Sequence, residues 1–300
     1  MTRLKVVDAH HHLWDLARNK HPWLQGERIP FRYGDYGAIC RTYLPDDYRR
    51  DSASFDVIGS VHMEAEHDPA DPVRETRWLH EVAERYGIPS GIVGAAFLDR
   101  DDADSVLAGH AAFPLVRSIR HKPRSAPAPD MVVPGAPGSM GDPRWRAGYR
   151  LLSKRRLSFD LQTPWWHLPE AAQLARDFPD TPIILNHTGL PSDRSAQGLA
   201  GWRAAMERFA AEPNALAKIS GIGQPGKPWT VEANGPIVRD VIRIFGVDRC
   251  MFASNFPVDS VCATFDEIFG GFRAIVADMT AGDQAKLFRD NAIRHYRLTI

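Results

Sequence analysis

The sequence is poor in cysteine and has no excess of either charge. Its three cysteines, Cys40, Cys250 and Cys262, are an odd number without C-x-x-C spacing, which signals neither a disulfide framework nor a zinc-thiolate site. Lys plus Arg and Asp plus Glu each total 37, so the formal net charge is +0. No long-range field therefore draws the chain to nucleic acid or to an anionic membrane. We expect a small-molecule partner instead.

Long apolar runs are also missing. No stretch approaches the roughly 20 apolar residues of a membrane-spanning helix, and the basic start MTRLKVVDAH lacks an apolar segment long enough for a signal peptide. We therefore expect a cytoplasmic protein. With 44% hydrophobic residues, residues 1–300 can bury one large core as a single domain. The sequence leaves open whether copies of the chain associate into a homo-oligomer.

Short apolar or β-branched runs alternate with stretches of helical period, which is typical of βα units and a parallel sheet. In the clearest helical stretch, Trp78, Val82 and Tyr86 recur every four residues. Eight strands in about 250 residues favour an α/β fold of the (β/α)8 TIM-barrel type over an open doubly wound sheet. The predicted strands begin at Leu4, Asp56, Ser90, Val116, Leu157, Pro182, Ala215 and Arg249.

Polar side chains follow almost every predicted strand. Barrel enzymes build their active sites from such residues, because the carboxyl ends of the strands meet at one mouth. A single polar residue at a strand end can equally mark the point where the chain reaches solvent, whereas a whole ring of them favours a site. The ring comprises His10, His12, Glu64, Glu66, Asp99, Arg120, His121, Gln162, His187, Lys218, Ser220 and Asn255.

Three consecutive histidines end the first predicted strand, in VVDAHHHLWD. The period of two along a strand places His10 and His12 on one face, together with Asp8. His11 then lies on the opposite face with Ala9. Two imidazoles at positions i and i+2 can chelate one divalent metal or donate two hydrogen bonds to one developing anion.

Several motifs occur in order between Val6 and Tyr296: VDAHHHLWD, HPWL, HMEAEHDPADPVRETRWL, SIRH, NHTGLP, AKISG and RCMFASNFPVD. Together they resemble the amidohydrolase superfamily. More narrowly, they resemble its amidohydrolase-related branch of sugar-lactone and 2-pyrone-4,6-dicarboxylate lactonases. The resemblance implies a TIM barrel and hydrolysis at a carbonyl centre.

The resemblance also implies a metal site with two departures. Metal-dependent relatives use the first-strand His-x-His, histidines on strands five and six, and an aspartate at the end of strand eight, which would make His10, His12 and His187 metal ligands. Gln162 stands in place of the strand-five histidine, and Asn255 in place of the aspartate. Neutral amides neither neutralise a divalent cation nor accept a proton from its bound water. We therefore expect no required cofactor, or a weakly bound divalent metal such as zinc.

Hydrolysis of a lactone or related cyclic ester needs a base for the attacking water and donors for the resulting oxyanion. We assign His187 as the general base, with a pKa near neutrality, and keep Glu64 as the competing base. His10 and His12 would polarise the carbonyl, directly or through a metal. Asn255 would orient the water.

Further residues are predicted to bind the substrate. The planar guanidinium of Arg120 would clamp a carboxylate or hydroxyl, with Lys218 as a second cation. Three of them also have a structural interpretation: a salt bridge at the rim for Arg120, a helix cap or loop position for Asp259, and packing under a loop for Trp165. The full set is Arg120, Lys218, Gln162, Trp165 and Asp259.

One segment, residues 122–142, is rich in proline, glycine and serine and follows the fourth predicted strand. Such long loops serve as lids or binding loops, or are flexible insertions.

Two other functions fit the same residues. A metal-dependent decarboxylase or amidohydrolase of the same superfamily would need stoichiometric zinc or manganese for turnover. A non-catalytic small-molecule binder would fit the two amides, Gln162 and Asn255, that stand in place of a histidine and an aspartate. Such a protein would bind a carbohydrate acid without converting it.

Overall fold

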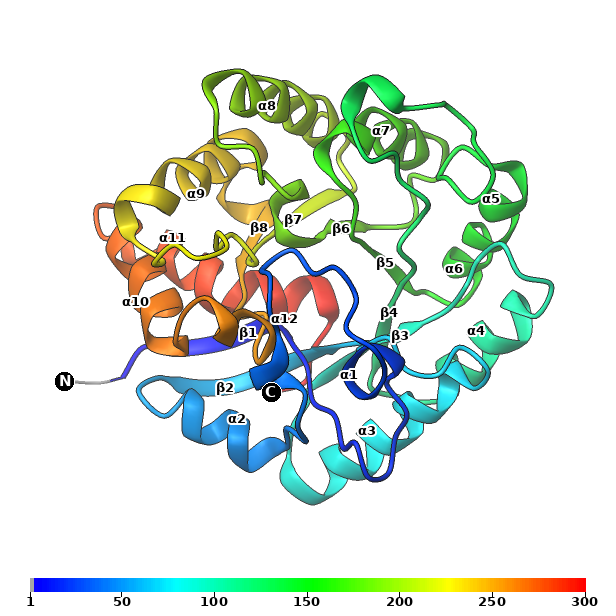
Figure 1. Cartoon of the computed structure of the whole chain (residues 1–300), viewed down its shortest axis with the longest axis horizontal. Coiled ribbons are helices and arrows are strands. Elements are labelled where there is room, and N and C mark those ends of the chain that lie inside the picture. The colour runs from blue at the N-terminus through cyan, green and yellow to red at the C-terminus, as the bar shows by residue number, and fades with distance from the viewer. Residues whose placement is uncertain (1–2) are drawn as a thin grey trace.

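Eight parallel strands form a ring at the centre of the computed structural model, which describes residues 3–300 (Figure 1). Each strand pairs with the next one in chain order. The predicted (β/α)8 TIM barrel is confirmed, and each strand begins within one residue of its predicted start. The strands are β1 (Lys5–His11), β2 (Asp56–Met63), β3 (Gly91–Ala95), β4 (Val116–Arg120), β5 (Ser158–Leu161), β6 (Ile183–Leu185), β7 (Ala215–Ile219) and β8 (Cys250–Phe252).

Helices surround this ring (Figure 1). The predicted helical stretch from Trp78 to Tyr86 is the second half of α3, which buries Trp78, Leu79 and Val82. The helices are α1 (Pro22–Gln25), α2 (Pro45–Asp51), α3 (Pro72–Tyr86), α4 (Ala103–Ala111), α5 (Pro143–Tyr149), α6 (Leu151–Lys154), α7 (Leu168–Asp177), α8 (Ala196–Ala210), α9 (Val231–Phe245), α10 (Phe265–Ile275), α11 (Ala281–Ala285) and α12 (Asn291–Tyr296).

The ring closes between β1 and the segment that follows β8. Asn255 N donates to His10 O over 2.8 Å, and His12 N donates to Phe256 O over 2.7 Å. These two hydrogen bonds fix the first and last strands against each other where both strands end. The polar residues that follow β1 and β8 are therefore neighbours, although about 245 positions separate them in the chain.

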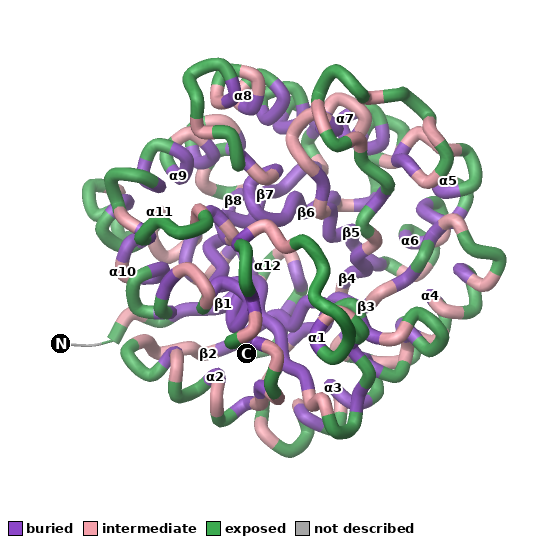
Figure 2. The backbone as a smooth tube through the Cα atoms, viewed as in Figure 1, coloured by how far each residue is buried: buried purple, intermediate pink, exposed green. Residues whose placement is uncertain are grey.

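The core has two layers, and buried backbone is concentrated in the strands (Figure 2). The outer layer lies between strands and helices. The inner cluster combines alternate strand residues, which the period of two points into the ring, with residues at the C-terminal end of the chain. Its buried members are Val7, Ala9, Val61, Met63, Val93, Ile184, Leu216, Met251, Ala253, Ala292, Tyr296 and Leu298.

Two long loops lie on the side of the strand ends. The loop between β1 and α2 contains α1 and passes across the end of the barrel in Figure 1. The predicted loop at 122–142 is irregular apart from one 3₁₀ turn, Pro129–Met131. Trp166 Nε1 donates to Ala126 O over 2.9 Å, and Ala126 N donates to His167 Nε2 over 2.8 Å. These contacts attach the start of that loop to the segment after β5.

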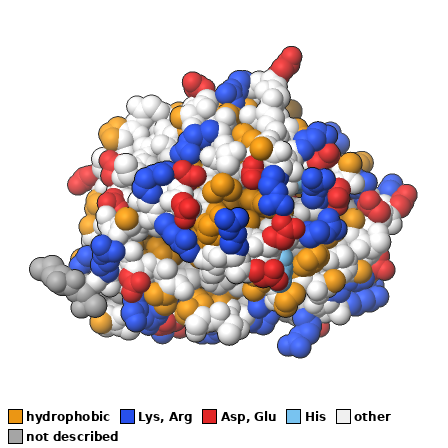
Figure 3. Space-filling view, turned by 90° about the horizontal axis from the view of Figure 1, so that it is seen from below, with side chains coloured by type: hydrophobic (Ala, Val, Ile, Leu, Met, Phe, Trp, Pro, Cys, Tyr) orange, Lys and Arg blue, Asp and Glu red, His pale blue; other side chains and the backbone are white. Residues whose placement is uncertain are grey.

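The surface mixes charges of both signs, as equal numbers of acidic and basic residues require (Figure 3). None of the helices in residues 3–300 has both the length and the apolar character needed to cross a membrane.

Candidate functional site

A bulge in β1 separates His11 from the other two histidines. Asp8 pairs with Ser60 and His11 pairs with His62, so three steps along β1 match two steps along β2. The extra residue shifts the side-chain alternation. The prediction that Asp8 shares a face with His10 and His12 is therefore wrong.

The side chains on the outer face of this bulge contact α2. Asp8 accepts a hydrogen bond from Tyr48 Oη over 2.9 Å, and the His11 ring lies 4.5 Å from the Tyr48 ring. Asp8 and His11 thus share the side that faces α2. His10 and His12 point to the barrel mouth, as the next contacts show.

His12 presents a lone pair to the mouth. Its Nδ1 lies 2.9 Å from Met63 O, and because a carbonyl only accepts, Nδ1 carries the proton and Nε2 does not. His12 Nε2 lies 3.3 Å from His10 Nε2 and 3.3 Å from Asn255 Oδ1. Burial lowers the pKa of both His10 and His12 well below 6.5, so both rings are neutral at pH 7.

Asn255 is held in one orientation. Its Nδ2 donates to Asp259 Oδ1 over 2.6 Å, which turns Oδ1 toward His12. The backbone of Asn255 is left-handed, with φ 56°, a conformation that most side chains avoid and that is often retained at functional sites. Asp259 is buried, and burial raises the pKa of its carboxyl above the ordinary value. Asp259 thus positions Asn255.

His187 lies against the same cluster. Its ring centre is 4.7 Å from that of His10, and its Nδ1 is 2.9 Å from Ser220 Oγ. His187 and the following Thr188 both have φ 53°. Burial, followed by the charges of Arg32, Arg120 and Lys218, holds the pKa of His187 well below 6.5. The imidazole is therefore neutral at pH 7, whereas the sequence led us to expect titration near neutrality.

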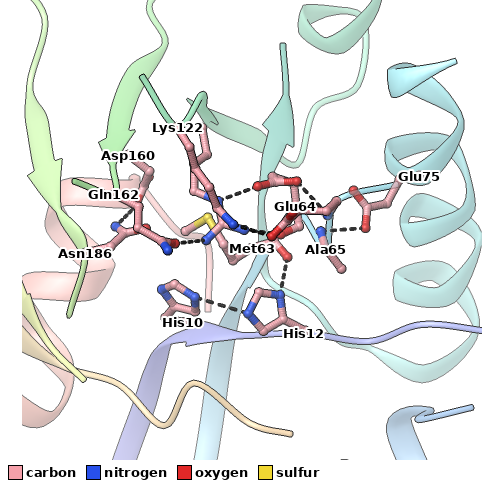
Figure 4. A network of polar contacts seen from close by, with 12 residues as sticks. His10, His12, Met63, Glu64, Ala65, Glu75, Lys122, Asp160, Gln162 and Asn186 are labelled. Carbon is pink, nitrogen blue, oxygen red and sulfur yellow. Dashed lines mark hydrogen bonds and ion pairs between the residues drawn. The ribbon is translucent and has the colours of Figure 1, made fainter. Parts of the chain in front are cut away.

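Glu64 and Arg120 form a buried ion pair, and Figure 4 shows Glu64 close to His12. Arg120 Nε binds the Glu64 carboxylate, Nη2 donates to Glu64 O over 2.6 Å, and Nη1 donates to Gln162 Oε1 over 3.1 Å. All three guanidinium nitrogens therefore have acceptors within the chain. Arg120 is not the free clamp that the sequence suggested, and Gln162 is its partner.

The Glu64 carboxylate is a poor base in this setting. Burial alone would raise its pKa, but the cations of Arg120 and Lys122 outweigh burial and hold the pKa below 4.5. The turn after Glu64 is fixed from outside the barrel, because Ala65 N donates to the buried Glu75 over 2.9 Å. Burial raises the pKa of Glu75 well above 4.5, so of the two buried carboxyl groups Glu64 and Glu75 it is Glu64 that carries the charge.

Two other predicted substrate contacts have partners within the chain. Lys218 is fully buried inside the barrel, with Nζ 2.7 Å from Asp160 Oδ1, and its charge lies near enough to His10 and His187 to lower the pKa of both imidazoles. Trp165 packs against α8, where a Cβ on Gly201 would lie 2.7 Å from its ring, which agrees with the alternative that it packs under a loop.

A pocket of about 480 Å³ opens at the ends of β2, β3 and β4. Glu64 and Arg120 form its charged wall, and Trp23, Ile29 and Phe97 form part of its apolar wall. His10 and His12 do not line it. They adjoin the pocket through Met63, which precedes Glu64 in the chain. The Met63 carbonyl accepts a hydrogen bond from His12 Nδ1.

The lone pairs at the barrel mouth could bind a weakly held cation. His12 Nε2 and Asn255 Oδ1 both accept hydrogen bonds, and two acceptors 3.3 Å apart favour a proton or a metal between them. Ligand atoms about 2.0–2.1 Å from a tetrahedral zinc are roughly 3.3 Å apart. Within residues 3–300, however, no group of three or more His, Cys, Asp or Glu side chains is arranged to hold a metal. His10, His12 and His187 therefore do not form such a group of metal ligands.

Three features of the site could not be predicted from residue types. Arg32 comes from the irregular loop after β1, and its Nη2 lies 3.6 Å from Asp259 Oδ1. The Met63 carbonyl fixes the tautomer of His12, and backbone atoms leave no trace in residue type. Ser220 was in the ring of polar residues, but its partner His187 was not foreseeable without the fold.

Comparisons with known proteins agree with this architecture. A sequence model described as amidohydrolase matches residues 7–298. An uncharacterized protein, y4mH, of Sinorhizobium fredii is 40% identical over 298 residues, which is 99% of this chain and 100% of that protein. An L-fucono-1,5-lactonase of Burkholderia ambifaria is 29% identical over 97% of this chain and 95% of its own length. A crystal structure of an amidohydrolase from Burkholderia multivorans with bound zinc has a TM-score of 0.80 at 22% identity, covering 98% of this chain and 99% of that one.

Proposed function

Because the chain belongs to the amidohydrolase family, we propose that it hydrolyses a lactone or related cyclic ester of a small molecule by attack of water on the ring carbonyl. The observation that carries the proposal is the convergence of His10, His12, His187 and Asn255, from three strand ends, beside a pocket large enough for a small molecule. The lactonase name of a relative supports the same reaction class.

His187 takes the proton of the attacking water. With a proton on Nδ1, donated to Ser220 Oγ, its Nε2 has the free lone pair. A lowered pKa keeps this ring unprotonated over the whole neutral range. Glu64 is disfavoured as the base because its carboxylate is paired with Arg120. A positioned base of this kind contributes about 10²–10⁴-fold to the rate.

The carbonyl is polarised from the side of His10. His12 Nε2 has no proton to donate, so direct polarisation falls to a proton on His10 Nε2. A divalent metal such as zinc would be held by His10, His12 and the amide oxygen of Asn255, and would supply Lewis-acid polarisation of the carbonyl. Its ligands are all neutral, so binding would be weak and metal dispensable. Asn255 also orients the water through its amide oxygen.

The two alternative functions differ from metal-optional hydrolysis in their need for metal or for a base. A metal-dependent decarboxylase would need a full equivalent of divalent metal, and the neutral ligand set argues against that. A non-catalytic binder would use the pocket without a base, and the placement of His187 on Ser220 favours catalysis instead.

The test is a library of small lactones assayed by acid release, with and without a chelator. We expect turnover of at least one lactone that survives chelation. His187→Asn should lower kcat by roughly 10²–10⁴-fold, whereas Glu64→Gln should change KM or stability more than kcat. Turnover that needs a full equivalent of metal would overturn the metal-optional mechanism, and near-normal kcat in a folded His187→Asn variant would transfer the base role.

A further inference from the structure

A second, smaller cavity lies beside His187, at the ends of β6 and β7. Its volume is about 150 Å³, and Arg32, Arg194, Ser192 and Gly221 are among the residues that line it. Gly221, with φ +62°, lets two groups approach its Cα: a Cβ there would lie 2.5 Å from His187 Nδ1 and 2.8 Å from Arg32 Nη2. One wall of the cavity is therefore shared with the proposed general base.

The guanidinium of Arg32 is incompletely paired. Nη2 approaches Asp259 Oδ1 at 3.6 Å, beyond hydrogen-bond distance, and the group lies over the Tyr33 ring at 4.5 Å. Nη1 is buried and has no hydrogen-bond partner within residues 3–300. A buried N–H of a charged group without an acceptor is rare, because it loses water and gains nothing in return.

Arg194 repeats this pattern from the other side. Its Nη2 donates to Ile222 O over 3.0 Å and to Asn234 Oδ1 over 3.5 Å, and its Nε is buried without a hydrogen-bond partner among the described residues. Arg194 makes no ion pair of 4.0 Å or less in the described part of the chain, since it is absent from all such pairs. Burial lowers the pKa of its guanidinium below the ordinary value.

We propose that this cavity is a carboxylate-binding site formed by Arg32 and Arg194. A carboxylate has two oxygens that accept several N–H groups at once, and guanidinium groups match it in geometry and charge. Two cations line the cavity. Asp259 lies 3.6 Å from Arg32 and accepts from Asn255, and no carboxylate of residues 3–300 lies within 4.0 Å of the Arg194 guanidinium. The unpaired N–H groups and the excess positive charge both call for a bound anion.

The inference rests on the proposed function and narrows its substrate. The carboxylate could be a substituent of the lactone, or it could be the one released when the ring opens. In either case it would be held next to His187, so its binding would place the ester carbonyl relative to the base. The substrate class is then a lactone acid, or a lactone whose hydroxy-acid product is retained.

The experiment compares two lactones that differ in one group: 5-oxotetrahydrofuran-2-carboxylate and its carboxamide. We expect kcat/KM for the carboxylate to exceed that for the carboxamide by at least about tenfold in the unmodified protein, as loss of one charge-assisted pair predicts. Arg194→Met should remove this difference by raising KM, with the carboxamide unaffected. Arg194→Lys, which keeps the charge but loses the planar fork, should restore part of it.

Matched controls remove a positive charge elsewhere. Arg28→Met removes an exposed cation from the loop that contains Arg32, and Arg208→Met removes an exposed cation from α8, which follows Arg194. Both should leave the preference for the carboxylate unchanged. Melting temperatures of all variants show whether a loss reflects unfolding.

Calorimetric titration with 4-hydroxybutyrate separates the two sources of the carboxylate. Weaker binding of 4-hydroxybutyrate in Arg194→Met assigns the cavity to the released carboxylate, whereas unchanged binding together with loss of the lactone-acid preference assigns it to a substituent. If Arg194→Met changes neither the binding of 4-hydroxybutyrate nor the preference for the lactone acid, the carboxylate site is refuted. If no lactone is hydrolysed at all, the proposed function fails, and calorimetric binding of the lactone acid still decides the cavity.

Discussion

At the scale of single residues, the position of Asn255 gives it a role that its residue type does not suggest. As an amide it cannot replace the charge of an aspartate. The structure nevertheless places its oxygen where a ligand would be, because Asp259 holds the amide nitrogen at 2.6 Å. The Asn255 amide oxygen and His12 Nε2 therefore lie at a separation that a metal ion could bridge, without the charge of an aspartate.

Because the Asn255 oxygen has the position of a ligand but carries no charge, the effect of Asn255→Asp can be predicted. The substitution adds a unit charge beside His12 Nε2, and a proton on Asp259, whose pKa burial already raises, replaces the hydrogen bond that Asn255 Nδ2 donates. Such a charge contributes about 4 kcal/mol to attraction at 4 Å for an effective dielectric constant of about 20. We expect zinc affinity to rise by roughly tenfold or more, which needs only about 1.4 kcal/mol. Titration calorimetry of chelator-treated protein measures it.

Asn255→Ala is the matched control for that prediction, since it removes the oxygen and should weaken zinc binding below that of the unmodified protein. Equal zinc affinity in Asn255→Asp, Asn255→Ala and the unmodified protein would mean that the ion binds elsewhere.

At the scale of elements, β1 shows how far a sequence pattern reaches. All eight strands were predicted within one residue at their starts, because each is a short apolar run between polar turns. The period of two then failed inside β1, where a bulge gives Asp8 and His11 the same face. Residue types carry no signal for a bulge, since it depends on how two strands pair.

Lys218 shows a part of the barrel interior that could have been predicted. It lies two positions after Leu216, which belongs to the inner cluster, so alternation points its side chain into the ring. Asp160 stands between Phe159 and Leu161 in a buried strand, which indicates a buried partner for a charge. Arg32 could not have been found in the same way, because its loop has no period.

The bulge in β1 also predicts different roles for neighbouring histidines. His11 is fully buried, packs on Tyr48 and has no hydrogen-bond partner for either ring nitrogen among the described residues. His11→Ala should therefore lower the free energy of unfolding by about 2–4 kcal/mol through the cavity it leaves, with kcat largely retained. His12→Ala should lower kcat by about 10² or more in a protein that still folds. Urea unfolding and steady-state kinetics measure the two effects, and equal kinetic losses at unchanged stability would contradict the assignment.

At the scale of the whole molecule, a buried polar network joins the barrel to the C-terminal end of the chain. Asp160 on β5 pairs with Lys218 on β7 and accepts from Asn186 Nδ2 over 2.8 Å. Tyr296, the last residue of α12, donates to both oxygens of Asp160, over 2.8 and 3.0 Å. The Lys218 ammonium also lies 5.0 Å from the Tyr296 ring centre. Two strands and the final helix therefore share one charge pair in the barrel interior.

The last prediction follows from the full burial of both charges in that pair. Removing one partner leaves the other charge uncompensated in the interior, so Lys218→Met and Asp160→Asn should each lower the free energy of unfolding by about 3–5 kcal/mol. The double variant has neither charge, and the asparagine oxygen can still accept from Tyr296 Oη. It should therefore be more stable than either single variant, as a double-mutant cycle from urea unfolding would show. Losses that simply add would mean that Lys218 and Asp160 are compensated separately, and that the network does not join the barrel to α12 through this pair.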